Sequence, residues 1–72
     1  MEGKIVYPLN TRLTGLIGRQ LEEGVRLIES EGLSWRIVVF DRKDKSFEQL
    51  NKMNDRVNLE VLGGKIVEAL VY

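Results

Sequence analysis

The sequence predicts an α+β fold: a single helix packed on a small mixed β-sheet, with the elements in the order β-α-β-long loop-β-β. Two patterns predict this class. Apolar residues between positions 20 and 30 recur at the spacing of a helix with one buried face. Further along, Val57, Leu59 and Val61 alternate with polar residues, as in a half-buried strand. With 72 residues, the chain has room for a single domain, residues 1–72, with one hydrophobic core.

The helix is expected over residues 20–30. Its apolar stripe at i, i+3, i+4 and i+7 consists of Leu21, Gly24, Val25 and Ile28. Glu22 and Glu23 fall in the first turn, where the helix dipole favours negative charge. A glycine inside a helix costs about 1 kcal/mol relative to alanine. We therefore interpret Gly24 as a position where the helix lies directly on the sheet, and Gly32 as the left-handed residue that ends the helix.

Short apolar runs predict four strands. Residues 4–7 and 35–40 are rich in β-branched and aromatic side chains. The second run is apolar almost throughout, which is typical of a central, parallel strand. Residues 57–62 and 66–72 form the last two strands. The Gly-Gly pair between them accepts the positive φ angles of a tight hairpin turn. The polar stretch at 41–54 is the long loop, and loops of this length are usually functional or disordered.

The charge balance of the chain argues against nucleic acid and membranes as partners. Eleven Lys and Arg residues offset eleven Asp and Glu residues, whereas nucleic-acid binders usually carry a basic excess. The chain contains no run of about 20 apolar residues, which is the length that a helix needs to cross a bilayer. The first residues, Met1 to Lys4, lack the features of a signal peptide. We therefore expect a cytoplasmic protein, with secretion of a processed form as the alternative.

The chain contains neither cysteine nor histidine. Disulfides and thiolate metal sites are therefore impossible. The commonest general base and the commonest metal ligand are also missing. We predict a binding protein that is not an enzyme and carries no metal or other cofactor.

Three segments, taken in order, resemble a known family. They are residues 16–24 (Leu-Ile-Gly-Arg-Gln-Leu-Glu-Glu-Gly), the apolar strand 36–39 (Arg-Ile-Val-Val), and residues 55–61 (Asp-Arg-Val-Asn-Leu-Glu-Val) followed by 64–67 (Gly-Lys-Ile-Val). They are similar to the potato type I inhibitors of serine proteases and to the related small bacterial and fungal elastase inhibitors. The resemblance covers most of the chain from Leu16 onward.

This resemblance implies that the loop before Asp55 is a reactive loop, presented to a protease cleft like a substrate. Counting back from Asp55 and Arg56, the contact residue is Leu50, followed by Asn51. Arg56 would brace the loop from below. A loop already held in its bound shape loses little entropy on binding. Leu50 would favour chymotrypsin-like, subtilisin-like or elastase-like proteases.

The chain also departs from the family pattern. Gln49 and Asn51 stand where the family usually has a small residue and an acidic one, and Asn58 replaces a second bracing arginine. In addition, Ser46 and Gln49 have the spacing of a capping box that begins a helix. In such a helix Phe47, Leu50 and Met53 would share one side, and a helix would not fit a protease cleft. The conformation of residues 46–54 separates these readings.

The second hypothesis is a small oligomeric binding module on the same fold, of a kind frequent in phages and other mobile elements. It would sequester a small anionic, nucleotide-like signal or block a host defence protein. We expect its ligand at a subunit interface lined by Arg36, Arg42, Arg56 and Asn58. Two of the singled-out residues also have purely structural alternatives: Leu50 as a packing residue of a short helix in the connector, and Arg56 as a surface arginine paired with Asp55 or Glu60.

The pattern of the last predicted strand indicates a homo-oligomer. Residues 66–72 are apolar on both sides, with Val67, Ala69 and Val71 on one face and Ile66, Leu70 and Tyr72 on the other. One helix can cover only one of these faces. We therefore expect the strand to pair with another copy.

Overall fold

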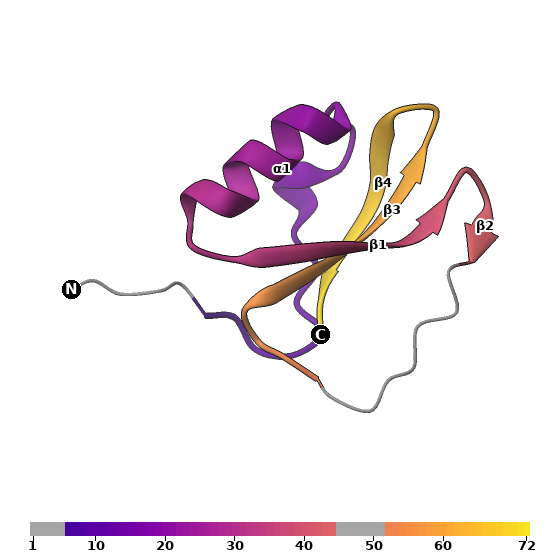
Figure 1. The fold of residues 1–72 in the computed structure, drawn as a ribbon. Coiled ribbons are helices and arrows are strands. Elements are labelled where there is room, and N and C mark those ends of the chain that lie inside the picture. Colours follow the sequence, from indigo (N-terminus) through magenta and orange to yellow (C-terminus); the bar gives the residue numbers. More distant parts are fainter. Residues whose placement is uncertain (1–5, 45–51) are drawn as a thin grey trace.

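The computed structural model describes residues 6–44 and 52–72 (Figure 1). Its elements in chain order are a 3₁₀ turn η1 (Thr14–Leu16), the helix α1 (Leu21–Ser30) and the strands β1 (Ser34–Phe40), β2 (Lys43–Asp44), β3 (Arg56–Leu62) and β4 (Lys65–Val71). The helix lies across one face of the sheet (Figure 1). The predicted α+β class, with one helix on a small mixed sheet, is confirmed.

The four strands form one sheet in the order β2-β1-β3-β4. β1 runs parallel to β3, with Ser34 opposite Arg56 and Ile37 opposite Leu59. The other two pairings are antiparallel. β1 is thus an interior, parallel strand, as its apolar run predicts. The two-residue strand β2 falls inside the stretch expected to be a plain loop, and it folds back on the end of β1.

The helix confirms the sequence pattern in detail. α1 covers Leu21–Ser30 with Glu22 and Glu23 in its first turn. Gly24 is buried, and a Cβ at that position would collide with the side chain of Ile66 on β4. Gly32, at φ 76°, takes the left-handed conformation just past the helix end. The helix therefore approaches the sheet closely because Gly24 leaves room for Ile66.

The hairpin between β3 and β4 turns on Gly63 and Gly64, whose φ angles of 60° and 79° suit a tight two-residue turn. The pairing register shifts near its tip. Glu60 lies opposite Glu68 but Val61 lies opposite Ile66, which leaves Val67 as an extra residue in β4.

This bulge corrects the predicted faces of the last strand. Strict alternation puts Ile66 with Leu70 and Tyr72, but Ile66 is fully buried together with Ala69 and Val71. The extra residue, Val67, reverses the alternation on either side of it.

The buried core lies between α1 and the sheet. It consists of Leu16, Ile28, Leu33, Val57, Leu59, Val61, Ile66, Ala69 and Val71. We call the side of the sheet that carries Val57, Leu59 and Val71 the helix face. The sheet residues between them point the other way. Trp35, half-buried, packs against the margin of this core, and its indole N–H donates to Glu29.

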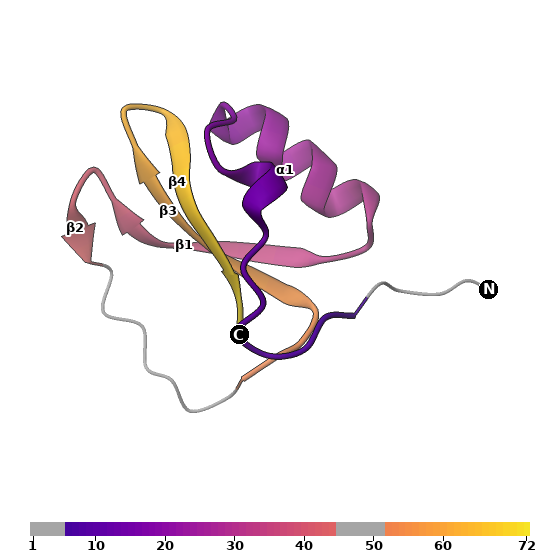
Figure 2. The same cartoon turned by 180° about the vertical axis from the view of Figure 1, so that it is seen from behind.

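The expected strand at residues 4–7 is not found in its described half, since Val6 and Tyr7 are irregular. Tyr7 N–H donates to the carbonyl of Asn54, but Pro8 has no N–H with which to continue a ladder. Residues 10–21 instead run along the outer edge of β4 (Figure 2). Their contacts include isolated bridges between Arg12 and Leu70 and between Gln20 and Lys65.

Candidate functional site

The connection between β1 and β3 is fastened to the sheet at its first end. Phe40 pairs with Lys43 and Val39 with Asp44 in the β1–β2 hairpin. Asp41 N–H donates to the carbonyl of Val61 at 2.7 Å, and the Asp41 carboxylate accepts from Gly63 N–H at 3.0 Å. The β1–β2 turn is therefore held beside the β3–β4 hairpin.

The second end of the connection is also fastened. Met53 N–H donates to the carbonyl of Tyr72 at 2.8 Å, and the Asn54 carbonyl accepts from Tyr7 N–H at 3.1 Å. The Asp55 carbonyl accepts from Ser34 N–H at 2.9 Å. Since β1 and β3 are parallel, the two fastened ends lie at opposite ends of the sheet.

Most of the predicted protease-contact residues come between these two fastened ends in the sequence. Phe47, Gln49, Leu50 and Asn51 lie outside the described residues, as do Ser46 and the capping box it was expected to begin. Met53 is described and is 39% exposed. The choice between an extended and a helical segment at 46–54 therefore stays a prediction.

Arg56, predicted to brace the loop, links the end of the connection to the sheet. It is the first residue of β3, and its side chain is half-buried on the sheet face turned away from α1. One guanidinium nitrogen, Nη2, donates to the carbonyl of Tyr72 at 2.9 Å. The other, Nη1, lies 3.3 Å from the sulfur of Met53. A single cation thus ties the end of the connection to the end of β4.

Arg36 and Asn58 form a second polar pair on the same face. They are register partners on β1 and β3, and Arg36 Nε donates to Asn58 Oδ1 at 2.5 Å. Asn58 is 1% exposed, and its Nδ2 donates to the carbonyl of Leu70 at 3.4 Å. The register between strands 22 residues apart creates this pair, so reading along the sequence misses it.

We call this side of the sheet the polar face. Its described members include Arg36, Arg56, Asn58, Glu60, Glu68 and Leu70. At its β4 margin Arg12 forms an ion pair with Glu68 at 2.7 Å. The hydrogen bond from Arg12 is the main reason why the pKa of Glu68 is lowered. Partial burial opposes this shift, and the Ala69 N–H adds to it.

The four residues predicted to bind an anion are not all neighbours. Arg36, Arg56 and Asn58 lie on the polar face near the start of β1 and β3. Arg42 lies in the β1–β2 turn with φ 71°, beyond the other end of β1, and is exposed. A cluster that used all four would have to span the length of the strand. Arg42 therefore lies apart from the other three residues, and an anion site formed by Arg36, Arg56 and Asn58 stays a prediction.

The strand predicted to join two copies has its outer edge occupied by its own chain. Leu13 N–H donates to Ala69, Val71 N–H donates to Thr11, and Ile66 N–H donates to Arg19. Edge-to-edge pairing of β4 with a second copy would have to displace these bonds. A homo-oligomer through residues 66–72 stays a prediction, and its contact would have to use the face of the strand.

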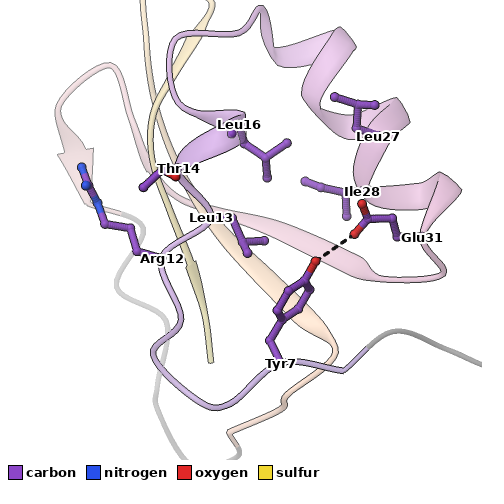
Figure 3. Close-up of a pocket in the computed structure, with 9 residues that line it drawn as sticks. Tyr7, Arg12, Leu13, Thr14, Leu16, Leu27, Ile28 and Glu31 are labelled. Carbon is purple, nitrogen blue, oxygen red and sulfur yellow. Dashed lines mark hydrogen bonds between the residues drawn. The ribbon is translucent and has the colours of Figure 1, made fainter.

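A pocket of about 360 Å³ opens on the helix side of the molecule (Figure 3). It lies between the second half of α1 and the segment that leads to η1. Its lining residues are Tyr7, Arg12, Leu13, Thr14, Gly15, Leu16, Leu27, Ile28 and Glu31. The hydroxyl of Tyr7 donates to the carboxylate of Glu31 at 3.2 Å across one end of it (Figure 3). Burial, and then this bond and the charge of Glu31, raise the pKa of Tyr7.

The sequence predictions did not include this pocket. The one available signal was Leu27, an apolar residue outside the predicted stripe of α1, which is 39% exposed. The pocket exists because the segment before η1 lies at a distance from α1. The periodicity of apolar residues along the sequence carries no information on that distance, so the pocket could not be predicted.

Neither a metal centre nor a membrane helix is found in the described residues. Within 6–44 and 52–72, acidic side chains nowhere gather in a group of three that could hold a metal ion. The same part of the chain has no helix with the length and apolar character that a bilayer crossing requires.

Comparisons of the chain with models of protein families, with curated proteins and with solved structures gave no match. Its function therefore has to be inferred from the geometry of this molecule.

Proposed function

We propose that the protein inhibits a serine protease through the connection between β1 and β3, with Leu50 as the contact residue and Arg56 as the brace. The observation that carries the proposal is the position of Arg56. Its guanidinium is bonded both to Tyr72 at the end of β4 and to Met53 at the end of the connection.

A fastened loop suits inhibition because the entropy of ordering it is largely lost on folding, before the protease arrives. The hydrogen bonds of Asp41 and Met53 hold the two ends of the connection. Between Asp44 and Met53 the sequence has eight residues, and the proposal requires that the fixed ends restrict this segment.

The same fastening explains how a substrate-like loop would resist turnover. If a protease cut the bond between Leu50 and Asn51, both new ends would stay tied to the sheet. The amine of Asn51 would remain next to the acyl-enzyme at a high effective concentration. It could then attack the ester and re-form the peptide bond before water does.

The first test measures inhibition constants for subtilisin, chymotrypsin and elastase with the wild type and with Leu50→Asp. We expect inhibition of at least one protease and a loss of more than about 100-fold in the variant, because a charge would enter an apolar specificity pocket. Leu62→Asp is the matched control, since Leu62 is an exposed leucine at the β3–β4 hairpin. Absence of inhibition at micromolar protein would contradict the proposal.

The second test addresses the brace. In Arg56→Ala the end of the connection loses its link to Tyr72, so we expect the protein to shift from inhibitor toward substrate. Mass spectrometry should then show faster accumulation of chain cut between Leu50 and Asn51. Arg42→Ala is the control, because Arg42 lies at the opposite end of β1. Equal cleavage of both variants would remove Arg56 from the mechanism.

A second candidate function is the binding of a small nucleotide-like anion, as in the oligomeric, phage-type module that blocks a host signal or defence protein. The specific observation in its favour is that Arg36 and Arg56 lie on one face beside the buried Asn58. Thermal-shift measurements with cyclic nucleotides would test it. A stabilisation that disappears in Arg36→Ala and persists in Arg42→Ala would favour this function over protease inhibition.

A further inference from the structure

The pocket beside α1 has an aliphatic interior. Leu13, Leu16 and Ile28 line it together with Leu27, and Figure 3 shows these side chains around one hollow. Leu16 and Ile28 are almost fully buried, whereas Leu27 is 39% exposed. Ligand pockets typically have volumes of roughly 300–1,000 Å³ and combine apolar walls with a few polar groups. The hollow has the size and lining of a small-molecule site.

The charge at the pocket is negative at one end. Glu31 carries a carboxylate, and the neighbouring Tyr7 donates a hydrogen bond to one of its oxygens (Figure 3). A tyrosine phenol has an ordinary pKa of about 10 and is protonated at neutral pH, and the pKa of Tyr7 is shifted further upward, so Tyr7 adds no second negative charge. A carboxylate can accept several hydrogen bonds, so it can bind a cation while it keeps the bond from Tyr7.

The cation that lines the pocket, Arg12, is engaged elsewhere. Its guanidinium bonds Glu68 on β4 at 2.7 Å, and in Figure 3 its side chain points away from Glu31. The charge of Arg12 is thus balanced by Glu68 outside the hollow. Glu31 is left as the charge that a ligand in the pocket would meet.

We propose that this pocket binds a small amphiphilic amine, with its apolar body against Leu27 and Ile28 and its ammonium group at Glu31. This site is on the helix side of the molecule and does not depend on the proposed protease inhibition. The ammonium group is selected because its charge complements that of Glu31. The apolar body of the ligand is selected because the pocket wall is aliphatic.

The test is a titration of the full chain with 2-phenylethylamine, followed by the backbone amide signals in two-dimensional NMR. We expect saturable shifts at Leu13, Gly15, Leu27 and Glu31. Two probes of similar shape serve as comparisons: neutral 2-phenylethanol and anionic phenylacetate. We expect the alcohol to bind about two- to five-fold more weakly than the amine, the range for an exposed ion pair, and the acid more weakly still.

Variants separate the charge from the wall. Glu31→Gln should bring the amine down to the affinity of the alcohol, while Glu22→Gln, at the other end of the same helix, should change nothing. Tyr7→Phe removes the hydrogen bond to Glu31 but keeps the carboxylate. It should keep the preference for the amine, which would show that the effect of Glu31→Gln comes from the lost charge and not from the lost bond to Tyr7. Leu27→Ser should weaken amine and alcohol equally.

Three results would overturn the proposal. One is the absence of saturable shifts at millimolar 2-phenylethylamine. Another is shifts that map to residues away from the pocket. The third is equal affinity for amine, alcohol and acid, which would remove the role of Glu31.

Discussion

The two faces of the sheet are built from alternate residues of the same strands, but one face is packed with apolar side chains and the other carries hydrogen-bonded polar groups. On the helix face, Val57, Leu59 and Val71 are fully buried under apolar neighbours. On the polar face, the buried residue of β3 is Asn58, and its neighbour Arg56 bonds to Met53 in the connection. Burial on the helix face therefore stabilises the domain, and burial on the polar face positions hydrogen-bonding groups. Substitutions on the two faces should separate stability from binding.

The largest expected difference compares two leucines. Leu59→Ala empties a fully buried site on the helix face and should lower the free energy of unfolding by about 2–5 kcal/mol. Leu70→Ala, on the neighbouring strand but on the polar face, removes a half-buried side chain and should cost about 1 kcal/mol. Urea unfolding measures both. Equal losses would mean that the polar face carries a second apolar core.

An intermediate effect is expected at the polar pair. Asn58→Ala removes the acceptor of Arg36 and the donor to Leu70 from a buried position. It should destabilise the fold by about 1–3 kcal/mol. Asn54→Ala is the matched control, because Asn54 is exposed and accepts from Tyr7 through its backbone carbonyl, which the substitution keeps.

A double-mutant cycle with Arg36→Ala then tests whether Asn58 acts through Arg36. We expect a coupling of about 0.5–3 kcal/mol. Strict additivity of the two substitutions would show that the two side chains stabilise the sheet independently.

The smallest effect is expected at the Arg12–Glu68 pair. The pKa of Glu68 is lowered in the folded state, chiefly by the hydrogen bond from Arg12. The ionised Glu68 therefore stabilises the fold above the unfolded pKa near 4.5, and this stabilisation is lost as pH falls through the folded pKa. Arg12→Ala should cost about 0.2–1 kcal/mol at neutral pH.

At about pH 3 the difference between wild type and Arg12→Ala should shrink. Denaturant unfolding at the two pH values checks this, with Arg26→Ala, an exposed arginine on α1, as the control. A difference that persists unchanged at low pH would show that Arg12 acts through packing and not through Glu68.

Local periodicity was sufficient to predict most of the fold. The helix, the central strand and the Gly63–Gly64 hairpin follow from spacing and turn chemistry within short windows. Gly24 was also interpretable, because a glycine inside a strong helix has to be explained by a close contact, and that contact is Ile66.

The features that were not predicted depend on contacts between distant segments. The bulge at Val67 is a register property of two strands, and it moved Ile66 to the helix face. The pairing of Arg36 with Asn58 depends on the parallel alignment of β1 and β3. The sequence could not show that Arg42 lies at the far end of β1, away from the other three residues predicted to bind an anion.

The covering of β4 by residues 10–21 also bears on the solubility of damaged chains. β4 contains the apolar sequence Ile-Val-Glu-Ala-Leu-Val, and its edge is bonded by Thr11, Leu13 and Arg19. An uncovered apolar edge strand is a template for cross-β aggregation. A proteolytic cut between residues 8 and 18 would loosen this cover while most of the core stays in place, so nicked molecules should aggregate sooner than intact ones.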